Sequence, residues 1–155
     1  MKTYLEEQTD RVPQTEQDIF RAVRRAVNSL PDEMPLGRGP DGKVILSCHI
    51  LARAVGRVFG LKCVDGFFHP TFQHSWLVTP SGNVIDVYPV GILGGPILAD
   101  RIHVCRRPDE GAAGHCYGLY IPRKTRQISW GRFGDAWFKR AVATVERHLR
   151  CPGGA

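Results

Sequence analysis

The chain has 155 residues, the usual size of one domain, and its 43% hydrophobic and 23% charged residues are close to globular averages. This composition argues against a disordered, a collagen-like or a membrane protein. Lys and Arg outnumber Asp and Glu by 21 to 15, and the excess is spread over residues 21–25, 101–107 and 123–150. Such a spread is more typical of a solvated basic surface than of a nucleic-acid site.

The N-terminus and the cysteine content predict a cytoplasmic protein. The first residues lack the cationic and apolar regions of a secretory signal, and no window reaches the roughly 18 apolar residues of a membrane span. Five cysteines at irregular spacing do not form a disulfide framework. A protein delivered into another cell would share these features. The sequence leaves the oligomeric state open.

A first helix is expected after an N-terminal arm. Residues 1–12 show no period and are expected to form a loose arm, with a single domain over residues 13–155. Thr15 is placed to cap the helix, whose apolar residues follow helical spacing until it ends by Pro31.

A second helix is expected after a loop rich in proline and glycine at residues 31–42. Ser47 is a favourable N-cap residue, apolar residues supply one face as far as Phe59, and Gly60 ends the helix. Cys48 therefore lies in the first turn.

The middle of the chain has the pattern of β-strands. Residues 62–68 are rich in strand-forming residues, and residues 74–79 and 84–88 form a hairpin around Ser81 and Gly82.

Shorter elements are expected in the second half. Residues 102–106 and 117–121 are strand candidates, the glycine-rich segment 89–96 is expected to pack as a loop over a cleft, and residues 135–150 have helical periodicity. The order of elements predicts an α+β fold in which the helix that bears Cys48 packs on an antiparallel sheet.

Cys48, His74 and Asp86 have the residue types of a cysteine-dependent catalytic triad. The first turn of a helix favours a thiolate because backbone N–H groups and the positive end of the dipole face it. The His74 imidazole would stabilise the thiolate and protonate the leaving group, while the Asp86 carboxylate would orient the ring. Taken singly, a core cysteine and a polar strand histidine remain the simpler interpretations.

The position of Asp86 depends on the turn. With a regular two-residue turn at residues 81–82, Asp86 pairs near Leu77 or Val78, roughly 10 to 13 Å along the strand from His74 at about 3.3 Å per residue. A bulge or a strong twist would then be needed for contact. A three-residue turn that ends in a left-handed residue would return Asp86 to the face of His74.

Two stretches carry these residues: SCHILARAVGRVFGL, which begins at Ser47, and HSWLVTPSGNVIDVYP, which ends at Pro89. A cysteine that starts a helix, then H-x-W opening a strand, a polar turn and an aspartate in the next strand resembles the transglutaminase-like branch of the papain-like cysteine enzymes. The spacing is similar to that of lasso-peptide leader peptidases and of small bacterial transglutaminase-like proteins. The resemblance covers about a quarter of the chain.

The resemblance implies acyl transfer through a thioester on a protein or peptide substrate, by hydrolysis, deamidation or transamidation. By position, Cys48 is the nucleophile, His74 the base and acid, Asp86 the orienting group, and Trp76 an aromatic neighbour that binds substrate. No cofactor or metal is expected. The backbone N–H of Cys48 is the default oxyanion donor, and the second donor is unassigned.

The sequence also offers candidate residues for a metal site and for a nucleic-acid site. A metal site could combine His103, Cys105, His115 and Cys116, with Cys63 and His69 as further ligands. Their spacing does not match the paired ligands of structural zinc sites.

Single-stranded nucleic acid could stack on Trp130, Trp137 and Phe138 beside basic residues, among them Arg123, Lys124, Arg126 and Arg132. We expect these aromatic residues to belong to the core instead.

His49 would face about 100° away from Cys48 on the helix and is expected to lie beside the site without serving the thiolate. The alternative function is a non-catalytic binding domain of the same fold that uses its basic surface for a protein or nucleic-acid partner.

Overall fold

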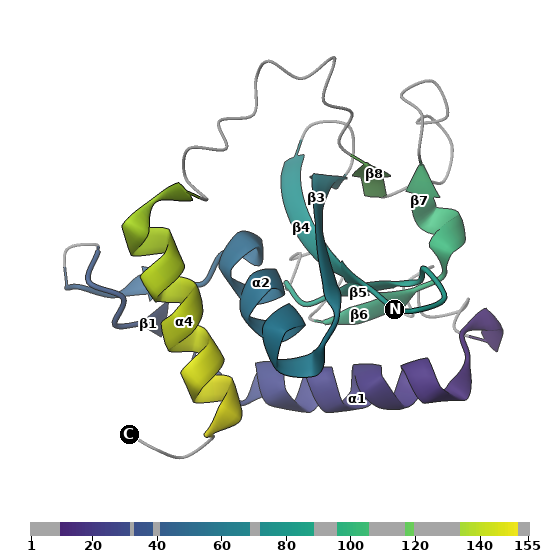
Figure 1. The fold of residues 1–155 in the computed structure, drawn as a ribbon, viewed down its shortest axis with the longest axis horizontal. Helices are drawn as coiled ribbons and strands as arrows, with labels where there is room; N and C mark the ends of the chain where they lie inside the picture. Colours follow the sequence, from purple (N-terminus) through teal and green to yellow (C-terminus); the bar gives the residue numbers. More distant parts are fainter. Residues whose placement is uncertain are drawn as a thin grey trace.

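The computed structural model describes residues 10–31, 33–38, 41–68, 72–88, 96–105, 117–119 and 134–151. Within these parts of the chain, three α-helices and a curled, mostly antiparallel sheet make an α+β fold, as expected (Figure 1). The helices are α1 (Gln14–Asn28), α2 (Cys48–Phe59) and α4 (Ala136–Arg150).

The larger sheet has the strand order β6-β5-β4-β3-β8-β7. Its strands are β3 (Lys62–Phe68), β4 (Phe72–Val78), β5 (Val84–Asp86), β6 (Ile97–Ala99), β7 (Val104–Cys105) and β8 (Tyr117–Leu119). Neighbouring strands are antiparallel, except that β7 and β8 run parallel. A separate two-stranded sheet pairs β1 (Glu33–Met34) with β2 (Val44–Ile45).

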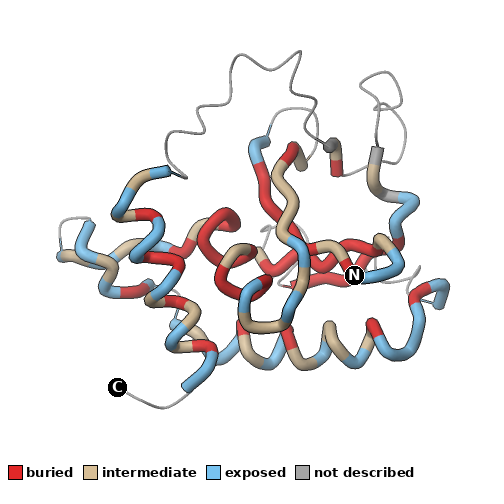
Figure 2. Tube along the Cα trace, in the orientation of Figure 1, coloured by how far each residue is buried: buried red, intermediate tan, exposed pale blue. Residues whose placement is uncertain are grey.

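Helix α2 occupies the centre of the molecule. It packs against β3 and β4 on one side and against α4 on the other, and it also contacts α1, which lies along the bottom of the view in Figure 1. Figure 2 shows that α2 is buried along much of its length, whereas α1 and α4 have exposed faces. The element that carries Cys48 is therefore the most enclosed helix of the three.

The sheet separates two apolar clusters. Successive side chains of β4 point to opposite faces, so Leu77 belongs to the large cluster beneath the helices, while Trp76 belongs to a smaller cluster on the other face. The smaller cluster consists of Trp76, Val84, Ile97, Ala99 and Tyr117. His74 and Asp86 lie on this second face, because each is an even number of residues from a member of the cluster on its own strand.

Helix α2 begins and ends where its capping residues predict. The Ser47 side chain accepts a hydrogen bond from the Ile50 N–H, and Gly60 adopts a left-handed conformation with φ of 66°. Strand β3 also has its expected bounds. Both elements carry strong local signals.

The expected cap of α1 was wrong. Thr15 lies inside the helix, and the N-cap position is Pro13, which has no capping hydrogen bond from its side chain. Val12, which was expected to belong to the loose arm, is buried in the large cluster, and the Gln17 side chain donates a hydrogen bond to the Val12 carbonyl. Residues 1–9 of the expected arm lie outside the described residues.

Several strand bounds also differ from expectation. The region expected as a strand at residues 102–106 contains a 3₁₀ turn at Arg101–His103 followed by the two residues of β7. Strands β1, β2 and β6 were not predicted, because each has only two or three residues and no measurable period. The loop expected at 89–96 lies outside the described residues, apart from Pro96.

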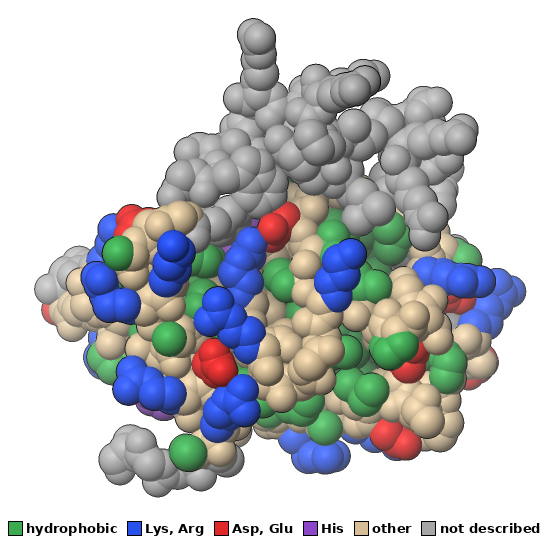
Figure 3. Space-filling view, in the orientation of Figure 1, with side chains coloured by type: hydrophobic (Ala, Val, Ile, Leu, Met, Phe, Trp, Pro, Cys, Tyr) green, Lys and Arg blue, Asp and Glu red, His purple; other side chains and the backbone are tan. Residues whose placement is uncertain are grey.

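Basic side chains do not form one patch on the visible face. In Figure 3, Lys and Arg side chains are scattered among apolar and neutral surface over several elements. Among the described residues, no helix is long and apolar enough to cross a membrane.

Candidate active site

Cys48 is the first residue of α2. The Ser47 carbonyl accepts hydrogen bonds from Ile50 and Leu51, which closes the first turn, whereas a residue at the first helical position has no carbonyl of its own helix to bond. The Cys48 N–H therefore makes no hydrogen bond within its own helix, and it remains the expected oxyanion donor. The positive end of the helix dipole faces the thiol.

His74 and Asp86 are in direct contact. His74 Nε2 lies 2.7 Å from Asp86 Oδ2, although the two residues belong to different strands. The pairing of Leu77 with Ile85 and of Val78 with Val84 puts Asp86 level with Trp76, two positions from His74 and on the same face. The regular hairpin that separates them by 10 Å or more is therefore wrong.

A three-residue turn produces this register. The Thr79 N–H bonds to the Asn83 carbonyl, so residues 80–82 form the turn, and Gly82 is left-handed with φ of 87°. One fewer residue in the turn would shift β5 by one position and direct Asp86 to the opposite face.

Asp86 is fully buried and accepts three hydrogen bonds. Besides His74, the Tyr117 hydroxyl donates to Oδ2 at 2.9 Å and the Tyr88 N–H donates to Oδ1 at 3.0 Å. A buried carboxylate is tolerated when its oxygens are satisfied in this way. Since the carboxylate only accepts, His74 Nε2 carries a proton, and Nδ1 is the ring nitrogen left for the thiol.

The Cys48 thiol is acidic. Burial alone would raise its pKa, but hydrogen bonds with His49 and His74, together with the charges of the two rings, outweigh burial and lower the pKa from 9.0 to about 6. Burial would also lower the pKa of His74, yet its hydrogen bonds and charge interactions with Asp86 and Cys48 raise it to about 9. Between these values the thiolate and the imidazolium coexist.

Aromatic rings enclose the His74 imidazole. Trp76 stacks on it at 6.3 Å between ring centroids and an angle of 22°, while Tyr88, Tyr117 and Phe68 contact it at steeper angles. Trp76 is fully buried, and its Nε1 is a buried polar atom for which the described structure offers no hydrogen-bond partner. It is thus an aromatic neighbour of the site, and its role in substrate binding stays a prediction.

The two candidate residues Cys48 and His74 are both buried. Cys48 keeps 8% of its surface exposed and His74 keeps 5%.

Two site residues were missed by sequence reasoning. His49 was expected to lie beside the site without serving the thiolate, but it is buried and is one of the groups that lower the pKa of the Cys48 thiol. Tyr117 was expected only as a strand residue, and its contact with Asp86 joins positions 31 apart in the chain. No local sequence pattern predicts either contact.

The proposed metal site lies mostly outside the described residues. Among the described residues, no group of three or more His, Cys, Asp or Glu side chains could hold a metal ion. The side chains of the proposed ligands His69, His103, Cys105, His115 and Cys116 lie outside the described residues.

The remaining candidates for nucleic-acid stacking behave as core residues. Phe138 is buried, and Trp137 Nε1 donates to the Leu36 carbonyl. Trp130 and the basic residues named with it lie outside the described residues.

Comparison with known proteins adds no relative. No family model matches the chain, and no curated protein or solved structure is similar enough to be identified as one. The function must therefore be argued from the site itself.

Proposed function

We propose that this protein is a cysteine-dependent acyl-transfer enzyme with a papain-like, transglutaminase-like core, acting on a protein or peptide substrate. Cys48 is the nucleophile, His74 the proton-transfer group, and Asp86 the group that orients His74. No cofactor or metal takes part.

The reaction uses the pair of charges at the site. The Cys48 thiolate attacks the substrate carbonyl carbon, and the resulting oxyanion accepts a hydrogen bond from the Cys48 N–H. His74 gives its Nδ1 proton to the leaving amine as the C–N bond breaks, which leaves a thioester. Water or an amine then attacks the thioester, loses a proton to His74, and releases the thiolate.

One observation carries this proposal. His74 Nε2 and Asp86 Oδ2 are 2.7 Å apart in the orienting geometry of a triad, while the same ring hydrogen-bonds with an acidic thiol. A cysteine that only packs in the core has no need of an imidazole held by a buried carboxylate. Four aromatic rings and two further donors to Asp86 hold that ring in one orientation.

Alkylation by iodoacetamide tests the activated thiol. The rate at Cys48, followed by peptide mass spectrometry across pH, should have its midpoint near the thiol pKa of about 6. Cys151, which is exposed, serves as the reference thiol in the same molecule. His74→Ala should slow Cys48 labelling markedly at about pH 6 and leave Cys151 unchanged.

Acylation tests the chemistry. Incubation with p-nitrophenyl acetate should release nitrophenolate in a burst and add one acetyl group at Cys48, removable by hydroxylamine as a thioester is. Cys48→Ser should abolish both. Labelling of Cys48 at the rate of Cys151, independent of His74 and without an acyl adduct, would instead favour the non-catalytic binding domain.

A further inference from the structure

A hydrogen bond joins the chain neighbours of the candidate nucleophile and of the candidate proton-transfer group. His49 follows Cys48 at the start of α2, and Ser75 follows His74 in β4. Both neighbours are buried, and His49 Nδ1 lies 2.7 Å from the Ser75 hydroxyl oxygen. Because consecutive α-carbons are only about 3.8 Å apart, this contact restricts the separation of Cys48 and His74.

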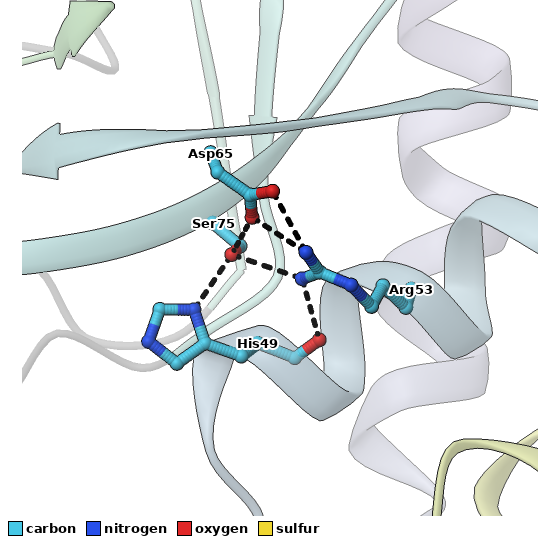
Figure 4. A network of polar contacts seen from close by, with 4 residues as sticks. All are labelled: His49, Arg53, Asp65 and Ser75. Atoms are coloured by element: carbon cyan, nitrogen blue, oxygen red, sulfur yellow. Dashed lines mark hydrogen bonds and ion pairs between the residues drawn. The ribbon is translucent and has the colours of Figure 1, made fainter. Parts of the chain in front are cut away.

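A polar network extends from this hydrogen bond to β3 (Figure 4). Asp65 is the residue of β3 that pairs with Ser75, and its Oδ1 accepts a hydrogen bond from the Ser75 hydroxyl at 2.5 Å. Arg53 lies about one turn after His49 in α2, and its Nη2 donates to both Asp65 oxygens, at 2.7 and 2.9 Å. Arg53 Nη1 donates to the Ser75 hydroxyl and to the His49 carbonyl, each at 3.2 Å. The polar network, which consists of His49, Arg53, Asp65 and Ser75, thus joins three elements.

The polar network lies on the helix side of the sheet. Side chains alternate along β4, so Ser75 points toward α2, where it meets His49, whereas His74 lies on the face that carries Trp76. Ser75 therefore cannot take the place of Asp86 beside the imidazole. Its influence on His74 passes through the position of the strand.

Apolar packing alone would leave the position of α2 along β4 less defined. The helix packs on the sheet through the large apolar cluster, with Leu51, Val55 and Leu77 among its members. Apolar burial is not directional, whereas a hydrogen bond weakens steeply as its geometry departs from the optimum. The ion pair of Arg53 and Asp65 is only 20% and 25% exposed, so water competes little for these bonds. The polar network therefore restricts the sliding and rotation of α2 that apolar contacts tolerate.

We infer that the polar network positions the nucleophile: by fixing the first turn of α2 against β4, it holds Cys48 within reach of His74. Its four members are positioning residues, because they act through the two elements that carry the thiol and the imidazole. This inference rests on the proposed function, since it concerns the same two groups.

Ser75→Ala removes the centre of the polar network. The substitution takes away the hydroxyl that the other three members share, and it leaves the candidate triad unchanged. The quantity to measure is the rate at which p-nitrophenyl acetate acetylates Cys48, followed as the mass of the adduct so that slow rates remain measurable. We expect a fall of about 100-fold, because a misplacement of about 1 Å can lower a rate by this factor.

A variant of similar stability controls for the folded state. Val23 is fully buried in α1 and belongs to the large apolar cluster, so Val23→Ala should lower the stability to urea without a change in the polar network. Under conditions in which both variants are folded, Val23→Ala should keep the wild-type acetylation rate.

The double variant Ser75→Ala/His74→Ala separates positioning from a general disturbance of the fold. If the polar network acts by holding Cys48 near His74, Ser75→Ala should change the rate of His74→Ala little, because no imidazole remains to be positioned. A general disturbance would instead lower the rate by the same factor in both backgrounds.

The possible failures are distinguishable. If the wild type itself forms no acetyl adduct at Cys48, the proposed function fails. If the wild type reacts and Ser75→Ala reacts equally fast, or slows both backgrounds by the same factor, only the positioning role is overturned.

Arg53→Lys gives the same test should Ser75→Ala fail to fold. Lysine keeps a positive charge near Asp65 but lacks the planar fork with which arginine reaches Asp65 and Ser75 together. It should lower the wild-type rate about tenfold, as the loss of one or two hydrogen bonds does, and leave the rate of His74→Ala nearly unchanged. A wild-type rate in a folded Arg53→Lys variant would then overturn the positioning role.

Discussion

His74 and Asp86 meet across two antiparallel strands although they are two positions out of register. The diagonal contact of 2.7 Å is possible because both side chains lie on the same face and the sheet is curled. The geometry of the candidate triad therefore depends on the hairpin turn more than on either side chain.

Asp86→Asn should impair the role of His74 while it keeps the volume of the side chain at position 86. The amide has no charge and one accepting oxygen in place of two, so the protonated ring loses its counter-charge and one of the two positions at which Asp86 accepts becomes a donor. We expect acylation of Cys48 to fall by about 100- to 10,000-fold, and the upper limb of its pH profile to move below about 9.

Tyr117→Phe is the matched control for this change. It removes one of the three donors to Asp86 and keeps the ring, so the rate should stay within about tenfold of the wild type. Stopped-flow measurement of nitrophenolate release gives both rates. A wild-type rate in Asp86→Asn would show that Asp86 does not orient His74.

Gly82→Ala should destabilise the hairpin that sets the register. The residue has φ of 87°, a conformation in which a β-carbon costs about 1 to 2 kcal/mol. Gly82→Asn should cost less, because asparagine tolerates left-handed backbone better than alanine does. Urea unfolding measures both, and equal losses for the two variants would contradict this account of the turn.

Glu16→Gln should weaken the same turn from a distance. The buried Glu16 carboxylate in α1 accepts hydrogen bonds from the Thr79 hydroxyl, the Ser81 N–H and the Asn83 amide. Glutamine replaces one accepting oxygen by a donor, so we expect a loss of about 1 to 3 kcal/mol in unfolding free energy near neutral pH.

The loss should disappear in acid. Burial would raise the pKa of Glu16, but its hydrogen bonds with Thr79, Asn83 and Ser81 outweigh burial and hold the pKa below 4.5. The stabilisation is therefore complete above pH 4.5 and is lost as the pH falls through the lower pKa of the folded state. Urea unfolding of both proteins across this range checks the sign, with the exposed Glu33→Gln as a control.

Local signals made α2 and β3 predictable from the sequence. Ser47 and Gly60 terminate α2 by their own backbone and side-chain chemistry, and Cys48 follows from the cap without any tertiary information. The candidate residues were therefore identifiable by type and order, and two of them, His74 and Asp86, are in contact as the hypothesis requires.

Long-range contacts account for what the sequence did not predict. Whether the turn has two or three residues depends partly on Glu16, which is more than 60 positions from it in the chain. The direction of the His49 ring depends on Ser75 in another element, so the 100° spacing along the helix was a poor guide. Periodicity describes the path of the backbone, whereas a long side chain is placed by its partners.

Gly66→Ala should disrupt the packing of the Trp76 ring beside His74. A β-carbon at Gly66 would lie 2.1 Å from the Gly118 carbonyl oxygen and 2.6 Å from Trp76 Cη2. Neither the paired β8 backbone nor the buried indole can move away without a loss of stability. Overpacking of this kind costs about 1 to 3 kcal/mol or more, and it should displace the ring that stacks on His74.

Gly134→Ala is the control, because a β-carbon there meets no atom within 4 Å and should change stability by less than about 0.5 kcal/mol. Thermal unfolding measures the stabilities, and Trp fluorescence reports the displaced indole. The Cys48 alkylation rate of Gly66→Ala should also fall, since His74 loses a stacked neighbour. A stable variant with wild-type labelling would show that the Trp76 ring can shift without disturbing the imidazole.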